Sequence, residues 1–262
     1  MKLFVPISIT LLIIIILLIL LGILLRRDKF INKIQHTKLF KINNYHIYVI
    51  NLKRSTERKN NMIKQLENCP IPWTIIEAID GTKKLPSDSI PIKPIRPMKP
   101  GEIGCFLSHI KVWKTFLANV DTTIAIIMED DCILPDKWWN SICSVCDKYM
   151  PNICNYIHLH KILYKFYMTI GNDVIDYFPE KNNKHLRDVE IDYSDIIITG
   201  PQLGMSCYAI DKKAALKLLT SIKTIITAID VQIHFPTIRK QFQWGKLKKN
   251  QIEHNLYKST IS

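Results

Sequence analysis

Three consecutive carboxylates, Glu129, Asp130 and Asp131, follow an apolar, β-branched run from Ile124 to Met128 that is typical of a buried strand. Adjacent carboxylates repel one another, and a hard divalent cation relieves that repulsion. Because side chains alternate along an extended chain, we expect Glu129 and Asp131 on one side and Asp130 on the other. Ligands of open α/β sheets bind outside the carboxyl ends of the strands, so Glu129 and Asp131 could hold Mn²⁺ or Mg²⁺ against a substrate diphosphate. A solvated acidic turn is the competing interpretation.

A strand followed by a helix is expected near the start of the domain. The run from Ile47 to Leu52 predicts the strand, and Ser55 or Thr56 can cap the helix after it. A helix N-terminus just beyond a strand attracts phosphate, and Arg54 and Arg58 would add positive charge there. The alternative is that both arginines are only solvated charges at a helix start.

Three further segments complete the first half of the domain. Trp73 to Ile79 predicts a second strand, which the dipeptide Asp80-Gly81 ends in a tight turn. The prolines between Pro86 and Pro100 exclude a regular helix or central strand, so we expect a loop that closes over a substrate. Apolar residues at helical spacing then predict a helix from Gly101 to Ala118.

Four segments occur in a characteristic order: Tyr48 to Arg58, Ile76 to Gly81, Gly101 to His109 and Met128 to Cys132. Together they resemble glycosyltransferase family 25, which includes lipooligosaccharide and collagen galactosyltransferases. The resemblance covers roughly residue 45 to the end of the chain. It implies an α/β, GT-A-like nucleotide-sugar transferase domain with a mixed central sheet.

The resemblance also implies roles for individual residues. Those on the donor side would be Asn51, Arg54, Arg58, Asp80, Gly81 and Asp130, and the metal ligands would be Glu129 and Asp131. Asp230 matches the family's late aspartate and would be the catalytic base, an acceptor-binding residue or a strand-end cap. His109 is the second catalytic candidate, although a lone histidine on such a helix is usually structural. His234 and His254 are secondary candidates for binding metal or diphosphate.

Two glycine positions bear on this resemblance. Gly101 and Gly104 would let a phosphate or sugar approach the start of the helix closely. Gly204-Met205 stands where the family normally has Gly-Thr, which weakens any role for a hydroxyl at position 205.

The second half of the domain carries weaker signals. Strands are expected at Tyr156 to His160, Ile196 to Gly200 and Met205 to Ile210, and helices from Pro135 to Met150 and from Lys212 through Ser221. His158 and His160 would share one side of their strand, where packed histidines are favoured over a second metal set. The polar segment from Lys161 to Asp192 is a candidate for acceptor specificity.

The chain has seven cysteines, an odd number that cannot be fully paired within one molecule. Cys143 and Cys146 lack a second pair at zinc spacing, so we interpret them as part of a helix face. Cys105 and Cys132 are expected in the core as small hydrophobic residues.

An uncharged aliphatic segment from Leu3 to Leu25 is expected to be a transmembrane anchor. As a helix it would be about 34 Å long, against a hydrocarbon core of about 30 Å. It is longer than the apolar region of a signal peptide and lacks a small-residue cleavage site. The predicted organisation is therefore an anchor in residues 1–25, a basic stem in 26–44 and a catalytic domain in 45–262.

The predicted membrane orientation is unresolved at this level. The resemblance implies a type II protein with its catalytic part in the lumen of the endoplasmic reticulum or Golgi. Basic residues are denser after the span than before it, however, and the positive-inside rule would keep the domain in the cytosol.

The 262 residues suffice for one sizeable core, and the formal net charge is +13. Such a charge suits an anionic partner, for example a nucleotide sugar or anionic lipid headgroups. No zinc-finger, RNA-recognition or homeodomain signature accompanies it, so we do not expect a nucleic-acid partner.

The resemblance implies that this membrane-anchored protein transfers a hexose, galactose or glucose, from a UDP-sugar to a hydroxyl of a glycan, glycolipid or protein. The resemblance implies inversion and metal assistance. A non-catalytic, membrane-anchored carbohydrate-binding relative of the same fold is the alternative. A phosphodiesterase or nuclease is disfavoured because no second metal cluster is evident.

Overall fold

The computed structural model of the protein describes residues 44–150, 152–160, 191–202, 204–249 and 252–254. The expected anchor at residues 3–25 lies outside these ranges, as do nearly all of the stem and residues 161–190. Within the described residues, no helix combines the length and apolar character that crossing a bilayer requires.

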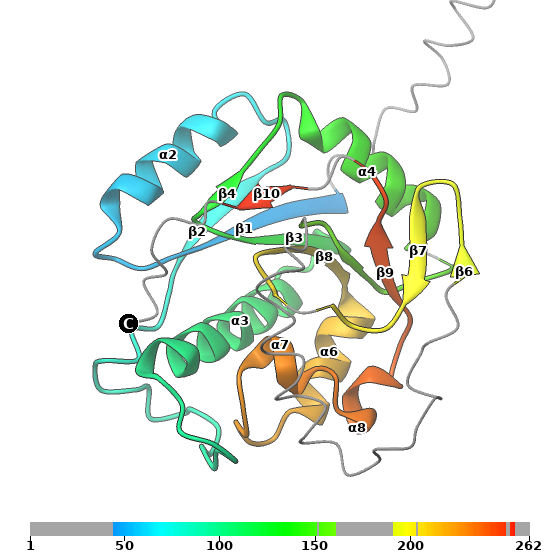
Figure 1. Cartoon of the computed structure of the whole chain (residues 1–262). Coiled ribbons are helices and arrows are strands. Elements are labelled where there is room, and N and C mark those ends of the chain that lie inside the picture. Colours follow the sequence, from blue (N-terminus) through cyan, green and yellow to red (C-terminus); the bar gives the residue numbers. More distant parts are fainter. Residues whose placement is uncertain (1–43, 151, 161–190, 203, 250–251, 255–262) are drawn as a thin grey trace, which may run out of the picture. The chain divides into compact units, whose positions relative to one another are not determined.

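A mixed eight-stranded sheet is the central element of the described domain (Figure 1). Its strands run in the order β2-β1-β3-β8-β5-β9-β7-β6. Their bounds are β1 Tyr45–Asn51, β2 Trp73–Glu77, β3 Ile124–Glu129, β5 Tyr156–His158, β6 Ile191–Asp192, β7 Ile196–Thr199, β8 Cys207–Asp211 and β9 Trp244–Leu247. A separate two-stranded sheet pairs β4 (Cys132–Ile133) with β10 (Glu253–His254).

Strand direction changes in the middle of the large sheet. β1 pairs in parallel with both β2 and β3, whereas β8 is antiparallel to β3 and to β5. Parallel strands end at the same edge, so the carboxyl ends of β1, β2 and β3 meet there. The mixed central sheet predicted from sequence is confirmed.

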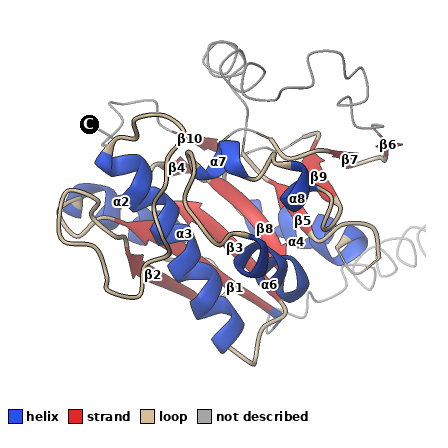
Figure 2. Cartoon of the chain, turned by 90° about the horizontal axis from the view of Figure 1, so that it is seen from below, coloured by secondary structure: helices blue, strands red, loops and turns tan. Residues whose placement is uncertain are grey.

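Helices cover both faces of this sheet (Figures 1 and 2). One face carries α2 and α4, and the other carries α3, α6, α7 and α8. Their bounds are α2 Thr56–Leu66, α3 Pro100–Ala118, α4 Trp138–Tyr149, α6 Lys212–Ser221, α7 Ile229–Gln232 and α8 Pro236–Arg239. The domain is therefore of the α/β class.

Alternation along β1 divides its side chains between the two faces. Tyr45 donates a hydrogen bond to the Cys143 carbonyl of α4, whereas Tyr48 and Ile50 join the core beneath α3 and α6.

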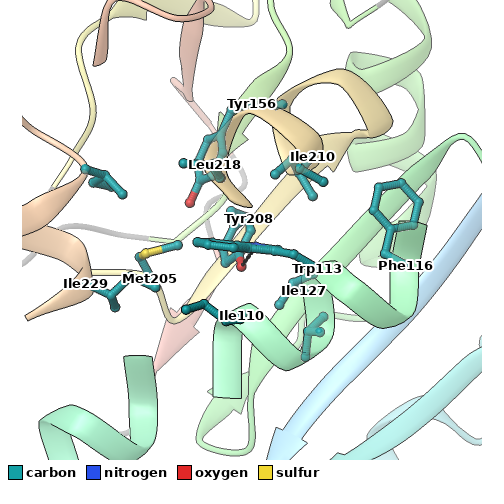
Figure 3. Close-up of a cluster of buried hydrophobic side chains, with 14 of the residues drawn as sticks. Ile110, Trp113, Phe116, Ile127, Tyr156, Met205, Tyr208, Ile210, Leu218 and Ile229 are labelled. Carbon is teal, nitrogen blue, oxygen red and sulfur yellow. Dashed lines mark hydrogen bonds between the residues drawn. The ribbon is translucent and has the colours of Figure 1, made fainter. Parts of the chain in front are cut away.

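Figure 3 shows the centre of that core, where side chains from α3, β8 and α6 gather. Trp113 is completely buried there, and burying a large apolar side chain contributes about 3 kcal/mol.

Most element boundaries agree with the sequence-based expectations to within two residues, and α6 matches at both ends. The helix expected from Pro135 begins only at Trp138, because Lys137 has a left-handed backbone (φ 50°) and the chain turns there. The strand expected to reach His160 ends at His158.

The proline-rich loop is anchored rather than free. Ile92 forms a parallel bridge with Ile225, and the backbone N–H of Ile95 donates to the carbonyl of Ile226. Arg96 forms an ion pair with Glu102 in the first turn of α3. These contacts tie the loop to the segment that precedes α7 and to the start of α3; whether it closes over a substrate stays a prediction.

Candidate functional site

The predicted acidic triplet lies where three parallel strands end. Glu129 is the last residue of β3, its neighbour in β1 is Ile50, and Asn51 in turn pairs with Glu77 of β2. The apolar run that precedes the triplet is buried and places it at this edge. The triplet therefore lies at the carboxyl edge of the sheet as predicted, which is where ligands bind in α/β folds.

Asp130 is buried and held by two residues of the β1–α2 unit. The Asn51 amide donates to it at 2.6 Å, and the Arg58 guanidinium donates at 3.1 Å. Burial raises the pKa of Asp130, which these two contacts partly counteract. Asn51 also donates to the Ser55 carbonyl, so one side chain joins the end of β1, the start of α2 and the acidic triplet.

Asp131 is the least satisfied member of the triplet. Its Oδ1 atom is buried without a hydrogen-bond partner, and the Arg58 guanidinium lies 3.9 Å from Oδ2. Burial, followed by the charge of Glu129, raises the pKa of Asp131 to about 7. A poorly compensated carboxylate beside a second one is what a divalent cation would stabilise.

Glu129 lies close to two residues of α3. Its Oε1 atom lies 3.5 Å from Nε2 of His109 and 3.7 Å from the Cys105 thiol. His109 is completely buried, and its Nδ1 is 2.9 Å from the Tyr208 hydroxyl. Trp113 donates to that same hydroxyl oxygen at 2.9 Å, which fixes Tyr208 and, through it, the imidazole ring.

Asp230 stands in the first turn of α7, so it does not end a strand. It accepts a hydrogen bond of 3.0 Å from the backbone N–H of Gly204, whose positive φ of 83° favours glycine. Burial raises the pKa of Asp230, and the charge of Glu129 raises it further. Asp230 in turn raises the pKa of the Cys105 thiol, which places its carboxylate within electrostatic reach of the β3 end.

The turn after β2 carries the predicted donor residues Asp80 and Gly81. Asp80 accepts from the hydroxyl of Thr82 and pairs with Arg54, and these contacts hold its pKa below the usual range. Gly81 packs against the start of α3, where a Cβ atom would lie 1.7 Å from the Pro100 carbonyl oxygen. The structure thus requires glycine there for packing.

Gly104 corrects one sequence-based hypothesis. A Cβ atom at this position would lie 2.4 Å from the Ile79 carbonyl oxygen and 2.8 Å from the Gly81 nitrogen. The close approach that we expected a phosphate or sugar to use is therefore filled by the turn after β2. Ser108 strengthens the same contact by accepting from the Ile79 N–H at 2.8 Å.

The remaining histidine candidates belong to other segments than the triplet. His158 and His160 are completely buried. His158 accepts a hydrogen bond from the backbone N–H of Gln202, and Nδ1 of His160 contacts the Cys207 carbonyl oxygen. Both histidines are therefore packed, as expected. Burial lowers the pKa of His234 to about 4. His254 belongs to β10, and its role as a ligand stays a prediction.

The cysteines follow expectation, and Cys105 has an additional contact. All seven are unpaired, Cys143 and Cys146 are buried on α4, and Cys132 is buried with its thiol against the Ser206 carbonyl. Cys105 is half-buried and packs against the core, as expected in part, but its thiol also approaches Glu129. The four-residue spacing between Cys105 and His109 on one helix was the signal that could have indicated this.

Comparison with known proteins places the chain in a family. Residues 44–233 match the family model "Glycosyltransferase family 25 (LPS biosynthesis protein)". The chain therefore belongs to glycosyltransferase family 25. The resemblance inferred from the four sequence segments is confirmed.

Curated relatives are similar over part of the chain. Procollagen galactosyltransferase 2 is 38% identical over 96 residues in Mus musculus and 38% identical over 112 residues in Homo sapiens. A glycosyltransferase 25 family member of Aedes aegypti is 32% identical over 114 residues. These matches cover 32%, 38% and 39% of this chain, but only 15%, 18% and 18% of the respective relatives.

Proposed function

We propose that the protein transfers a hexose, galactose or glucose, from a UDP-sugar to a hydroxyl of a glycan, glycolipid or protein acceptor, with inversion at the anomeric carbon. The observation that carries this proposal is the group of carboxylates at the carboxyl edge of the sheet, where Asp131 has a buried, unpartnered oxygen beside Arg58. The two mammalian relatives are named galactosyltransferases, which favours galactose as the sugar. A GT-A-like arrangement agrees with the mixed sheet.

The donor diphosphate would bind between the triplet and the start of α2. No side chain caps that helix, so its first-turn N–H groups are available to phosphate oxygens. Arg54 is half-exposed, and Arg58 reaches from α2 to Asp130 and Asp131. The turn at Asp80 and Gly81 would contact the nucleoside.

Glu129 and Asp131 are the proposed ligands of Mn²⁺ or Mg²⁺. Their chemistry fits such an ion, because both are carboxylates and Asp131 is disfavoured as an uncompensated anion. A bound divalent cation would neutralise charge that develops on the leaving diphosphate. Asn51 and Arg58 would keep Asp130 in place, so that the triplet retains its shape.

Asp230 is the proposed general base. Its carboxylate would take the proton of the acceptor hydroxyl while that oxygen forms a bond to the anomeric carbon and UDP leaves with the electron pair. A raised pKa suits this task, since it makes the carboxylate a stronger base. His109 fits a positioning role better than a catalytic one, because its Nε2 faces Glu129 and its Nδ1 contacts Tyr208.

The proposed cellular setting rests on the apolar segment and on the family resemblance, which implies a type II orientation. We infer that residues 3–25 anchor the enzyme in an endomembrane, with the catalytic domain on the luminal side. Protease protection of the domain in sealed microsomes would test this orientation.

The test of the transfer reaction uses the purified full-length chain and a panel of nucleotide sugars, each with and without Mn²⁺. A ligand that binds only the native state raises the melting temperature. We expect the largest rise with a UDP-hexose and Mn²⁺ together, and release of UDP when an acceptor sugar is added. Stabilisation without UDP release on any of a panel of acceptors would favour the carbohydrate-binding alternative, and no stabilisation would contradict the donor assignment.

A further inference from the structure

We propose that Cys105, His109 and Glu129 form a three-ligand site for a divalent transition metal such as Zn²⁺. In the part of the chain that the structure describes, these residues bring one sulfur, one nitrogen and one oxygen ligand atom within 4.8 Å of one another. The site shares Glu129 with the proposed Mn²⁺ ligands but adds a thiol and an imidazole. It concerns metal binding alone and does not depend on the transfer reaction.

Two elements hold the three ligands. Cys105 and His109 are four residues apart on α3, so their side chains project from one face, a turn apart. Glu129 projects toward that face from the end of β3. Ligands on a helix and a strand end are placed more rigidly than ligands on a loop.

Two of the three distances between ligand atoms match those of a tetrahedral metal. Bonds of about 2.3 Å to sulfur and about 2.0–2.1 Å to nitrogen or oxygen would place sulfur and oxygen about 3.6 Å apart, and nitrogen and oxygen about 3.4 Å apart. The Cys105 Sγ to Glu129 Oε1 distance is 3.7 Å, and the His109 Nε2 to Glu129 Oε1 distance is 3.5 Å. Little movement is needed to accommodate the ion.

The state of His109 provides an independent indication. The residue is 0% exposed, and its Nε2 atom has no hydrogen-bond partner although it is aimed at Glu129. Its Nδ1 atom is 2.9 Å from the Tyr208 oxygen, which also accepts from Trp113. A phenol oxygen has two acceptor lone pairs, so it can accept from Nδ1–H as well and leave Nε2 free to bind metal.

The donor set favours a particular class of metal. Thiolate and imidazole ligands suit Zn²⁺ and similar borderline ions, whereas Mg²⁺ demands six oxygen ligands. Because the Glu129 side chain is 31% exposed, solvent reaches this end of the site. Three protein ligands with an accessible fourth position are typical of reactive rather than purely structural zinc sites.

The test measures metal binding by the purified full-length chain, from which a chelator has first removed bound metal. We expect each chain to bind one added Zn²⁺, and added Co²⁺ to give the near-ultraviolet absorption of a thiolate-to-metal charge transfer. Cys105→Ser should abolish that absorption and weaken Zn²⁺ binding by at least about 100-fold, since even outer-shell partners change metal affinity 10–100-fold. Cys69→Ser is the matched control, because Cys69 is also half-buried and unpaired but lies after α2.

Thermal unfolding without metal shows whether each variant is folded. A folded wild type that binds no Zn²⁺, or a folded Cys105→Ser variant that binds it as tightly as wild type, would overturn the proposal. Stabilisation by UDP-sugar and Mn²⁺, measured without Zn²⁺, reports separately on the proposed transferase function. The two proposals therefore fail independently.

Discussion

Replacing Asp131 with asparagine should stabilise the metal-free protein while abolishing metal-dependent transfer. The Asp131 side chain is only 20% exposed, and one of its oxygens is buried without a partner. Asparagine has nearly the same shape as aspartate but carries no charge. It therefore removes an anion that is disfavoured both by burial and by repulsion from Glu129. A gain in stability that accompanies a loss of function is characteristic of a residue retained for its site chemistry.

The magnitude follows from the change in pKa. The pKa of this carboxyl rises from 3.8 to about 7 in the fold, and each pKa unit corresponds to about 1.4 kcal/mol. The anion is therefore disfavoured by about 4 kcal/mol at most, and about 2 kcal/mol after solvent screening and the sharing of repulsion with Glu129. For a domain of this size, about 2 kcal/mol raises the melting temperature by about 4–8 °C.

The pH dependence has a definite sign. A folded-state pKa above the unfolded value means that this group favours the fold below about pH 4 and that the contribution is lost as the pH rises through about 7. The advantage of Asp131→Asn should therefore be largest above pH 7 and shrink as the pH falls toward 4. Thermal unfolding across this range, without metal, measures it, with exposed Asp136→Asn as the control.

Two results would refute the reasoning. A variant that is less stable than wild type above pH 7 without metal would show that Asp131 is not a disfavoured anion. A folded variant with normal Mn²⁺-dependent turnover would show that the carboxylate is not a metal ligand.

Three other substitutions test the remaining parts of the site. Gly104→Ala should destabilise the protein by about 2 kcal/mol or more, because its Cβ would clash with the Ile79 carbonyl, and thermal unfolding against Gly101→Ala would detect it. Asp230→Asn should lower kcat by about 100-fold or more while donor binding persists; wild-type kcat should fall as the pH drops through the raised pKa of Asp230, and an unchanged kcat would exclude it as the base. Tyr208→Phe should weaken Zn²⁺ binding about 10–100-fold, since His109 loses its anchor, and unaltered affinity in a folded variant would contradict that role.

The sequence predicts the elements of the first half of the domain well, because their signals are local. β3 is a continuous apolar run, and α3 carries apolar residues at helical spacing. Each pattern predicts the type of its element without information on the neighbouring elements. The carboxyl-edge position of Glu129 then follows from the rule for parallel strands. The start of α4 was placed too early because a left-handed Lys137 leaves no comparable pattern.

Contacts between elements were harder to predict. The alternation of side chains along a strand assigns each residue to one face of the sheet, but it does not show which element packs against that face. It placed Glu129 with Asp131, but it could not show that Glu129 also lies near His109 or that Arg58 lies near Asp131. The role of Gly104 was misassigned for the same reason, because its neighbour is the turn after β2. Tyr208 gave no signal at all, being one apolar position among several in β8.

The beginning of α3 links two parts of the site that sequence treats separately. Gly104 and Ser108 fix the turn that follows β2, which is proposed to contact the nucleoside. Cys105 follows Gly104 in the sequence, and His109 follows Ser108. Both of these side chains lie near Glu129 at the end of β3. Because a helix moves as a rigid unit, a displacement of α3 shifts the nucleoside turn and the surroundings of the metal ligand together. Variants on this turn should therefore change donor affinity and metal affinity in the same direction, whereas Asp131 and Asp230 should each affect one step.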